Sequence, residues 1–227
     1  MNATTIPADQ SAIAQAASLG LFFDTETTGI PEFHKPSEDP CQPHIVQLAA
    51  KLVDLDTRQT LETLDLIIRP DGWIIPPETI EVHGITMERA MDEGVPEEEA
   101  LERFWTMWAK RHRIAHNEQF DQRILRIGLK RYFDIRNPDL EVQPSDEWKA
   151  GTVECTARMT TKICNLPPTA AMVRARRNHP KTPKLTEAYL HFFGREMEGA
   201  HNALNDVDGC MAVYFAVKDM QREAVPA

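Results

Sequence analysis

The stretch LFFDTETTG, Leu21 to Gly29, runs from three apolar residues directly into an acidic turn that contains Asp24 and Glu26. A short apolar run that ends in a turn signal predicts a buried strand, on which residues two positions apart project from the same face. The two carboxylates should therefore point together. Because such a pair is costly to bury unpaired, the pattern favours a site where a hard divalent cation lies between them. A strand that ends in a solvated acidic turn is the alternative.

The composition indicates one main globular domain. Of the 227 residues, 42% are hydrophobic and 26% are charged, and no apolar run approaches the ~20 residues of a membrane span. We expect an N-terminal arm at residues 1–18, which lacks the basic and apolar regions of a signal peptide, and a single domain at residues 19–222. The expected location is the cytoplasm, with no membrane as a partner. The four scattered cysteines favour free thiols.

The distribution of charge is uneven. A net charge of −10 argues against a general polyanion-binding protein. Residues 174–184 nevertheless contain five basic residues and no acid, and residues 123–136 hold a second basic run. A charge run usually marks a solvated face. The local density of positive charge also leaves a track for nucleic-acid phosphates open.

Three strands are expected in the first part of the chain. The Pro-rich segment at residues 30–44 predicts a loop, because four prolines exclude a helix or a central strand. Residues 44–54 and 60–69 each have a strand-like pattern and are separated by a short polar turn. Together with the strand at residues 19–24 they predict a three-stranded antiparallel meander.

The second part of the chain alternates helices with short strands. The spacing predicts a helix within residues 95–111, a parallel strand at residues 113–116, and then a helix that Asn117 caps and that carries Asp121 in its first turns. Residues 137–151 are expected to form a loop before a short strand at residues 152–154. Helices are expected near residues 156–165, 184–193 and 203–222, with an irregular basic insertion near residues 166–183.

A third polar block, AHNALND at residues 200–206, precedes the last helix. It places His201 at the beginning of that helix and Asp206 in its first turns. A single histidine or aspartate in such a position is more often a cap or a partner of the helix dipole. Four carboxylates and one imidazole spread over three blocks instead favour a common site.

The blocks FDTETTG, HNEQFD and HNALND closely resemble the three exonuclease motifs of the DEDDh family, the DnaQ-like 3′→5′ exonucleases that include the epsilon proofreading subunit of DNA polymerase III. The stretches IEVHGIT and KLTEAYLHFFG resemble further blocks of that family. The resemblance covers about Leu19 to Val217. It implies an α/β ribonuclease H-like fold, in which a mixed five-stranded sheet of three antiparallel and two parallel strands is flanked by helices.

The resemblance also assigns roles by position. It implies two Mg²⁺ or Mn²⁺ ions per site, held by the carboxylates of Asp24, Glu26, Asp121 and Asp206. His201 takes the position of the general base, and together these five residues form the catalytic set. The implied substrate-binding residues are Thr25, Glu78, His83 and Asn117. Carboxylates are the ligands that these cations prefer, and an imidazole with an unperturbed pKa near ~6.5 can accept a proton at neutral pH.

The expected function is metal-dependent 3′→5′ exonuclease activity, which releases nucleoside 5′-monophosphates from DNA ends, with proofreading as one role. An RNA-trimming exoribonuclease of the same fold is the first alternative. A non-catalytic nucleic-acid-binding or polymerase-associated module is the second, although binding alone does not require all five chemical residues. A small-molecule phosphoesterase is the third. The expected partners are single-stranded nucleic acid 3′ ends, with DNA favoured over RNA, and a DNA polymerase.

Overall fold

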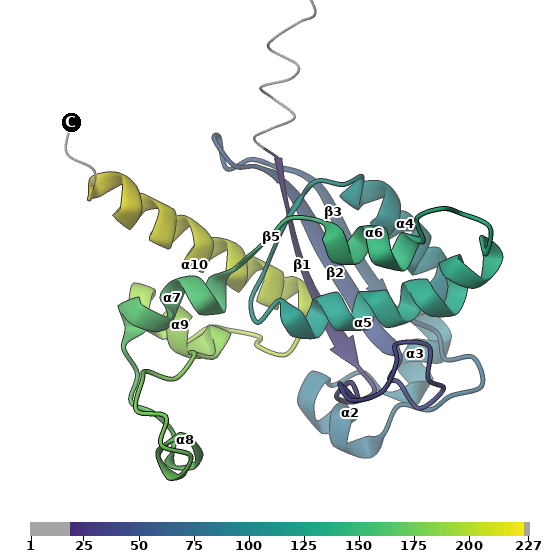
Figure 1. Ribbon diagram of the computed structural model, residues 1–227, viewed down its shortest axis with the longest axis horizontal. Helices are drawn as coiled ribbons and strands as arrows, with labels where there is room; N and C mark the ends of the chain where they lie inside the picture. The colour runs from purple at the N-terminus through teal and green to yellow at the C-terminus, as the bar shows by residue number, and fades with distance from the viewer. Residues whose placement is uncertain (1–18, 225–227) are drawn as a thin grey trace, which may run out of the picture.

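The sheet has five strands in the order β3-β2-β1-β4-β5 in a computed structural model that describes residues 19–224 (Figure 1). The expected arm at residues 1–18 lies outside the described residues. The central strand is β1 (Leu19–Thr27), which pairs antiparallel with β2 (Ile45–Asp54), and β2 pairs antiparallel with β3 (Thr60–Ile67). On its other side β1 pairs parallel with β4 (His112–Ala115), and β4 pairs parallel with β5 (Val153–Cys155). The predicted strand order, including the short fifth strand, is confirmed.

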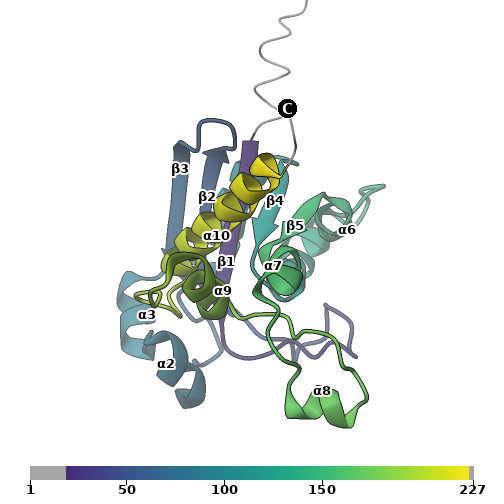
Figure 2. The same cartoon turned by 90° about the vertical axis from the view of Figure 1, so that its left-hand side faces the viewer.

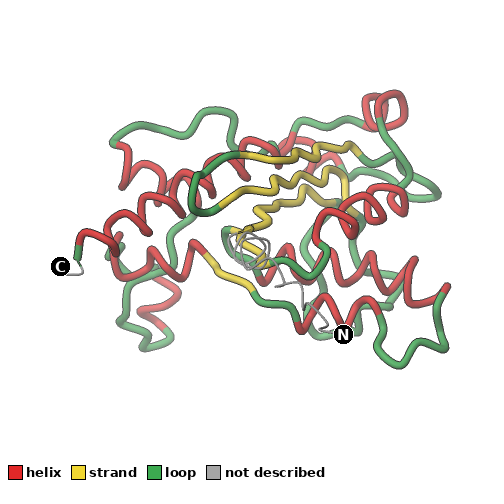
Figure 3. Tube along the Cα trace, turned by 90° about the horizontal axis from the view of Figure 1, so that it is seen from above, coloured by secondary structure: helices red, strands yellow, loops and turns green. Residues whose placement is uncertain are grey.

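Helices cover both faces of the sheet (Figures 2 and 3). The helices at one face include α4 (Glu97–Trp108), α5 (Gln119–Leu129) and α6 (Pro144–Ala150), and they pack on the β1 side chains of Leu21 and Phe23. The opposite face is covered by the long helix α10 (Ala203–Glu223), which packs on Phe22. The other helical segments are α2 (Pro77–His83), α3 (Met87–Glu93), the π-helix η1 (Lys130–Asp134), α7 (Thr156–Cys164), α8 (Ala170–Arg174) and α9 (Leu185–Phe193).

The alternation along β1 decides what each helix faces. Leu21 and Phe23 point to the α4 and α5 side, so Phe22 and the following even-numbered residues, Asp24 and Glu26, point to the α10 side. The acidic pair therefore lies on the face that α10 covers, at the carboxyl end of the central strand.

The loop predicted at residues 137–151 is wrong in its second half, where α6 (Pro144–Ala150) forms. Proline is accepted in the first turn of a helix, because its missing N–H would have no intrahelical partner there. Trp148 of α6 is fully buried and donates its indole N–H to the carbonyl of Gln122 at 3.0 Å. Tertiary packing of this tryptophan thus outweighs the loop-like composition.

The predicted cap of α5 is also wrong. Asn117 has a left-handed backbone, with φ of 59°, and α5 begins after Glu118 without a side-chain cap. Asparagine tolerates this conformation, which turns the chain sharply between β4 and α5. In contrast, α3 has a side-chain cap, because the Thr86 hydroxyl accepts the Arg89 backbone N–H at 3.2 Å.

The four cysteines are free thiols, as predicted.

None of the described helices is both long enough and apolar enough to cross a membrane.

Candidate active site

Three carboxylates from two elements converge at the carboxyl end of β1. Asp24 and Glu26 of β1 and Asp206 of α10 each offer an oxygen, and these oxygens all lie within 4.8 Å of one another. All three side chains are partly buried. The prediction that Asp24 and Glu26 point together is confirmed, and the structure adds that they face α10. The site therefore presents only oxygen donors, which are the ligands that hard divalent cations prefer.

Asp121 in the first turn of α5 is the fourth predicted carboxylate. It is buried, and its Oδ1 accepts two hydrogen bonds from Thr25, one from the backbone N–H at 3.0 Å and one from the hydroxyl at 2.7 Å. Because Thr25 lies between Asp24 and Glu26, these bonds fix α5 to the acidic end of β1. Asp121 lies close enough to act on the titration of both β1 acids, although it is not among the three convergent oxygens.

Mutual repulsion and burial disfavour the charged forms of these acids. Burial, with the charges of Asp121, Asp206 and Glu26, holds the pKa of Asp24 well above its usual range. Burial and the charges of Asp206 and Asp121 raise the pKa of Glu26 to about 8. Burial also raises the pKa of Asp121 to about 7, against the hydrogen bonds from Thr25, and the pKa of Asp206 to about 6. A bound cation would relieve this repulsion, so the donor set fits a divalent metal ion.

His201 lies immediately before α10, but it is not the cap of that helix. The cap is Asn202, whose side chain accepts the backbone N–H of Asn205 at 3.3 Å. The backbone N–H of His201 donates to Oδ2 of Asp206 at 3.3 Å, and its φ of 67° places it in a left-handed turn. The residue is exposed, and its imidazole forms no hydrogen bond with residues 19–224. The ring is therefore free to meet a substrate or a water molecule beside Asp206.

Gln47 of β2, which the sequence analysis missed, fixes the beginning of α10 to the sheet. It lies opposite Glu26 in the strand register and is buried. Its Oε1 accepts the backbone N–H of Ala203 at 3.1 Å and the side-chain N–H of Asn202 at 3.4 Å. These bonds hold the Asp206 turn against the β1 acids. The only signal in the sequence is that Gln47, like Lys51, interrupts the largely apolar run IVQLAAKLV.

An open pocket of about 180 Å³ lies beside Glu26. Its wall is largely apolar and comes from the end of β1, the following loop, α2 and α5: Thr25, Glu26, Thr27, Gly29, Ile30, Thr79, Val82, His83 and Phe120. Two predicted substrate-binding residues, Thr25 and His83, are thus in its lining. Glu78 and Asn117 are exposed and are not part of that lining.

His83 presents a polar atom that the protein leaves unpaired. Its Nδ1 accepts the backbone N–H of Ile85 at 3.1 Å, so the neutral ring carries its proton on Nε2. Within the described part of the chain, Nε2 is buried and has no hydrogen-bond partner. Burial also lowers the pKa of this histidine, which favours the neutral ring. A ligand oxygen in the pocket would satisfy this donor.

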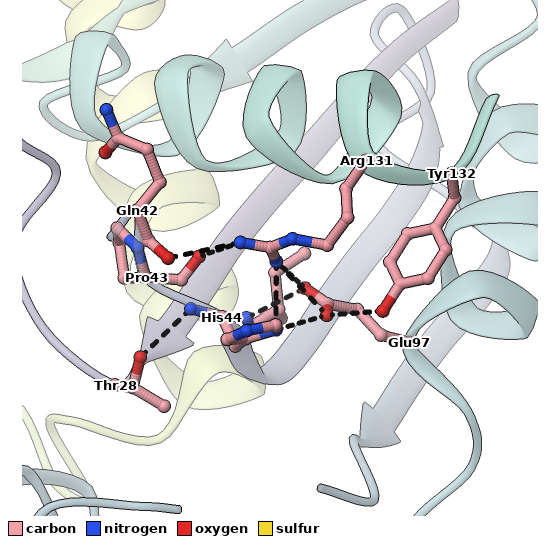
Figure 4. A network of polar contacts seen from close by, with 8 residues as sticks. Thr28, Gln42, Pro43, His44, Glu97, Arg131 and Tyr132 are labelled. Atoms are coloured by element: carbon pink, nitrogen blue, oxygen red, sulfur yellow. Dashed lines mark hydrogen bonds and ion pairs between the residues drawn. The ribbon is translucent and has the colours of Figure 1, made fainter. Parts of the chain in front are cut away.

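A buried polar network braces the end of β1 against β2 (Figure 4). At its centre, the Glu97 carboxylate interacts with Nδ1 of His44 at 2.7 Å and accepts the Tyr132 hydroxyl at 3.1 Å. Arg131 lies 3.4 Å from the same carboxylate. His44 in turn donates its backbone N–H to the Thr28 hydroxyl at 2.9 Å. The network thus fixes the chain just after the acidic pair, and the sequence analysis did not predict it.

Comparison with known proteins agrees with this geometry. A family model described as "Exonuclease" matches residues 21–214. Among curated proteins, none matches the chain. The structure is similar to that of E. coli Exonuclease I in complex with a dT13 oligonucleotide, with a TM-score of 0.69, 21% identity, and coverage of 91% of this chain and 42% of that chain.

Two further solved structures show the same relationship. A moderately thermophilic Exonuclease I from Methylocaldum szegediense has a TM-score of 0.64 and 21% identity, and the match covers 90% of this chain and 41% of that chain. A product-bound exonuclease I has a TM-score of 0.62 and 21% identity, with 91% and 44% covered. This chain therefore spans less than half the length of these structures, and at this identity the likeness is one of fold. Because the family model covers most of the chain, the chain belongs to the exonuclease family, and the resemblance of its motifs to that family is confirmed.

Proposed function

We propose that this chain is a metal-dependent 3′→5′ exonuclease that hydrolyses the terminal phosphodiester bond of single-stranded DNA and releases nucleoside 5′-monophosphates. The observation that carries the proposal is the convergence of Asp24, Glu26 and Asp206 within 4.8 Å, beside an open pocket of about 180 Å³ that Glu26 also lines. Membership of the exonuclease family supports the reaction class.

The proposed metal ligands are Asp24, Glu26, Asp121 and Asp206, which would hold two Mg²⁺ or Mn²⁺ ions. When bound, such ions supply an activated water and offset the charge on the phosphate and on the leaving oxygen. The chain's own contribution is to hold the four carboxylates in place, through the bonds from Thr25 to Asp121 and from Gln47 to the beginning of α10.

His201 is the proposed general base, which accepts the proton of the attacking water. Two observations support this role. Asn202 caps α10, so His201 is not needed as the cap, and the backbone N–H of the exposed His201 donates to the Asp206 carboxylate at 3.3 Å. A ring that can turn freely beside the carboxylates can reach a water there, whereas a ring fixed by protein partners could not.

The pocket beside Glu26 is the proposed site for the terminal nucleotide. Apolar side chains such as Ile30 and Phe120 can contact a base or a sugar, and the unpaired Nε2–H of His83 can donate to an oxygen of the nucleotide. DNA is the favoured substrate because two of the similar solved structures are complexes with dT13 and dA16 oligonucleotides. A DNA polymerase partner in proofreading is proposed on the motif resemblance alone, and co-purification with a polymerase subunit would test it.

The direction of hydrolysis tests this function. We expect a strand labelled at its 5′ end to give a ladder of progressively shorter products with Mg²⁺, and a strand labelled at its 3′ end to release labelled mononucleotide at once. Both reactions should stop with a chelator. Release of mononucleotide first from a 5′-labelled strand would contradict the proposed polarity, and faster hydrolysis of an RNA strand of the same sequence would replace DNA by RNA as the substrate.

A further inference from the structure

A long basic segment separates β5 from α9. Residues 155–186 contain no Asp or Glu, although the chain as a whole has a net charge of −10. The positively charged residues of this segment are Arg158, Lys162, Arg174, Arg176, Arg177, Lys181 and Lys184. We use the name basic arm for residues 166–183, which include α8.

The arginines at the tip of the basic arm are not neutralised by the protein. Outside the tip, Arg158 pairs with Glu118, and Lys181 pairs with Glu187. Arg174, Arg176 and Arg177 are all exposed, and none of their side chains pairs with a carboxylate of residues 19–224. Three unneutralised guanidinium groups on an acidic protein form a local site for an anion.

The base of the basic arm is fastened to the edge of the sheet that carries the carboxylates. The backbone N–H of Lys181 donates to the Leu166 carbonyl at 3.1 Å, which closes the base of the arm. Buried His116 lies 3.0 Å from the Pro183 carbonyl through Nε2 and 2.9 Å from the Thr156 hydroxyl through Nδ1. Because His116 directly follows β4, it ties the arm to the carboxyl end of that parallel strand.

The arm projects beyond this edge of the sheet. In Figure 2, α8 lies below the carboxyl end of β1 on one side, and α2, whose His83 lines the nucleotide pocket, lies on the other side. A strand with its 3′ end at the carboxylates can therefore continue along the edge toward the arginines. Without the arm, the acidic body of the protein would repel a longer strand.

The turn that presents these arginines is well defined. Arg177 donates its backbone N–H to the Met172 carbonyl at 2.9 Å, and Arg176 donates its own to the Val173 carbonyl at 2.9 Å. These bonds end α8 with Arg176 in a left-handed conformation, with φ of 56°, a position that glycine usually occupies. An arginine here keeps a cation at a position where glycine would be conformationally easier.

We propose that the basic arm binds phosphates of the substrate strand several nucleotides away from the bond that is cleaved. The proposal rests on the proposed exonuclease function and adds a second contact region for longer strands. The planar guanidinium groups match phosphate oxygens, and such contacts are independent of sequence. The arm therefore raises the affinity for long strands without taking part in hydrolysis.

The test compares three variants on two substrates, a dinucleotide and a strand of about 12 thymidine nucleotides. The first variant replaces Arg174, Arg176 and Arg177 by alanine. The second is Arg176→Gly, which removes one cation and eases the turn. The control replaces three other exposed basic residues by alanine: Arg103, which pairs with Glu99, Lys110, which pairs with Glu147, and Lys149. Lys110 and Lys149 precede the parallel strands β4 and β5, so they lie at the opposite edge of the sheet.

We expect the triple arm variant to lose about tenfold in kcat/KM on the long strand at low salt and to keep its activity on the dinucleotide. The slope of log affinity against log salt should become less negative by about 2, because each phosphate contact to a single strand contributes about 0.7 and three arginines are removed. Arg176→Gly should lose less kcat/KM on the long strand than the triple variant, and its melting temperature should be unchanged or higher. This result separates a loss of binding from a loss of folding.

Three results would overturn the proposal: an equal loss on both substrates, no loss on the long strand, or an equal loss in the control variant. If the arm variants bound the long strand normally, an acidic protein segment would be a better candidate than nucleic acid for the ligand of these arginines. Fluorescence anisotropy of the labelled strand in chelator separates this proposal from the proposed function. If wild type hydrolyses neither substrate, the exonuclease function fails, and the arm is still judged by whether the triple variant loses strand binding.

Discussion

Replacement of Glu26 by glutamine should stabilise the metal-free protein at high pH. Glu26 has a pKa raised from 4.5 to about 8 by burial and by the charges of Asp206 and Asp121. A raised pKa means that the folded protein holds this proton more tightly than the unfolded chain does. The contribution of Glu26 to the free energy of unfolding is therefore fully present below pH ~4.5 and is lost as the pH rises through about 8.

The size of the effect follows from that rise. At about 1.4 kcal/mol per pKa unit, a rise from 4.5 to about 8 would lower the free energy of unfolding at high pH by about 5 kcal/mol. Because Glu26 is partly exposed, solvent screens its charge, and we expect a loss of about 2 kcal/mol. For a chain of this size, the melting temperature of Glu26→Gln should exceed that of wild type by about 4–8 °C at pH ~9 in chelator. The two proteins should melt together near pH ~5.

Calorimetry in chelator at the two pH values is the assay. Glu62→Gln is the control, because Glu62 is exposed on β3, and it should melt like wild type at both pH values. Added Mg²⁺ should raise the melting temperature of wild type more than that of Glu26→Gln, because a cation that binds the folded state stabilises it. Equal melting temperatures at pH ~9, or the same difference at both pH values, would refute the reasoning.

Three other substitutions test separate parts of the site. His201→Gln should lower kcat by about 10²–10⁴-fold and leave the stabilisation by Mg²⁺ nearly unchanged, and wild-type turnover would exclude the general-base role. His83→Ala should raise KM more than it lowers kcat, because the unpaired Nε2 donor is lost; an unchanged KM would make His83 a structural residue. Glu97→Gln should lower the free energy of unfolding by about 2 kcal/mol in denaturant titrations, since it leaves Arg131 without its carboxylate; an unchanged value would mean that the network does not stabilise the fold.

The sheet was largely predictable because its strands carry strong local signals. The apolar run before Asp24 and the turns around residues 54–60 define the antiparallel strands, and the helix that follows directs β4 into a parallel position. The helix α6 was missed because proline and acidic residues mark both loops and helix beginnings. The helix forms because Trp148 packs against Phe23 and Phe104, with ring centroids 5.5 Å apart in each pair. No local sequence pattern indicates such contacts between distant residues.

The acidic residues of the site were predictable for a related reason. Asp24 and Glu26 lie on a strand with period two, and Asp206 ends the recognisable block at residues 200–206 where α10 begins, so their convergence follows from the fold. The supporting residues were not predictable. Gln47 contacts a residue 156 positions away, and Glu97 contacts one 53 positions away. The sequence shows such residues only as single polar positions, whose partners appear when the chain is folded.

The catalytic role of the carboxylate cluster is tested most directly by phosphodiester hydrolysis in Asp24→Asn. The substitution keeps the shape of the side chain but removes the charge of a residue at the centre of the cluster. With Mg²⁺ and single-stranded DNA, we expect the rate to fall by at least about 10²-fold, while the melting temperature in chelator is unchanged or higher. A folded Asp24→Asn protein that keeps near-normal Mg²⁺-dependent hydrolysis would contradict the assignment of the active site.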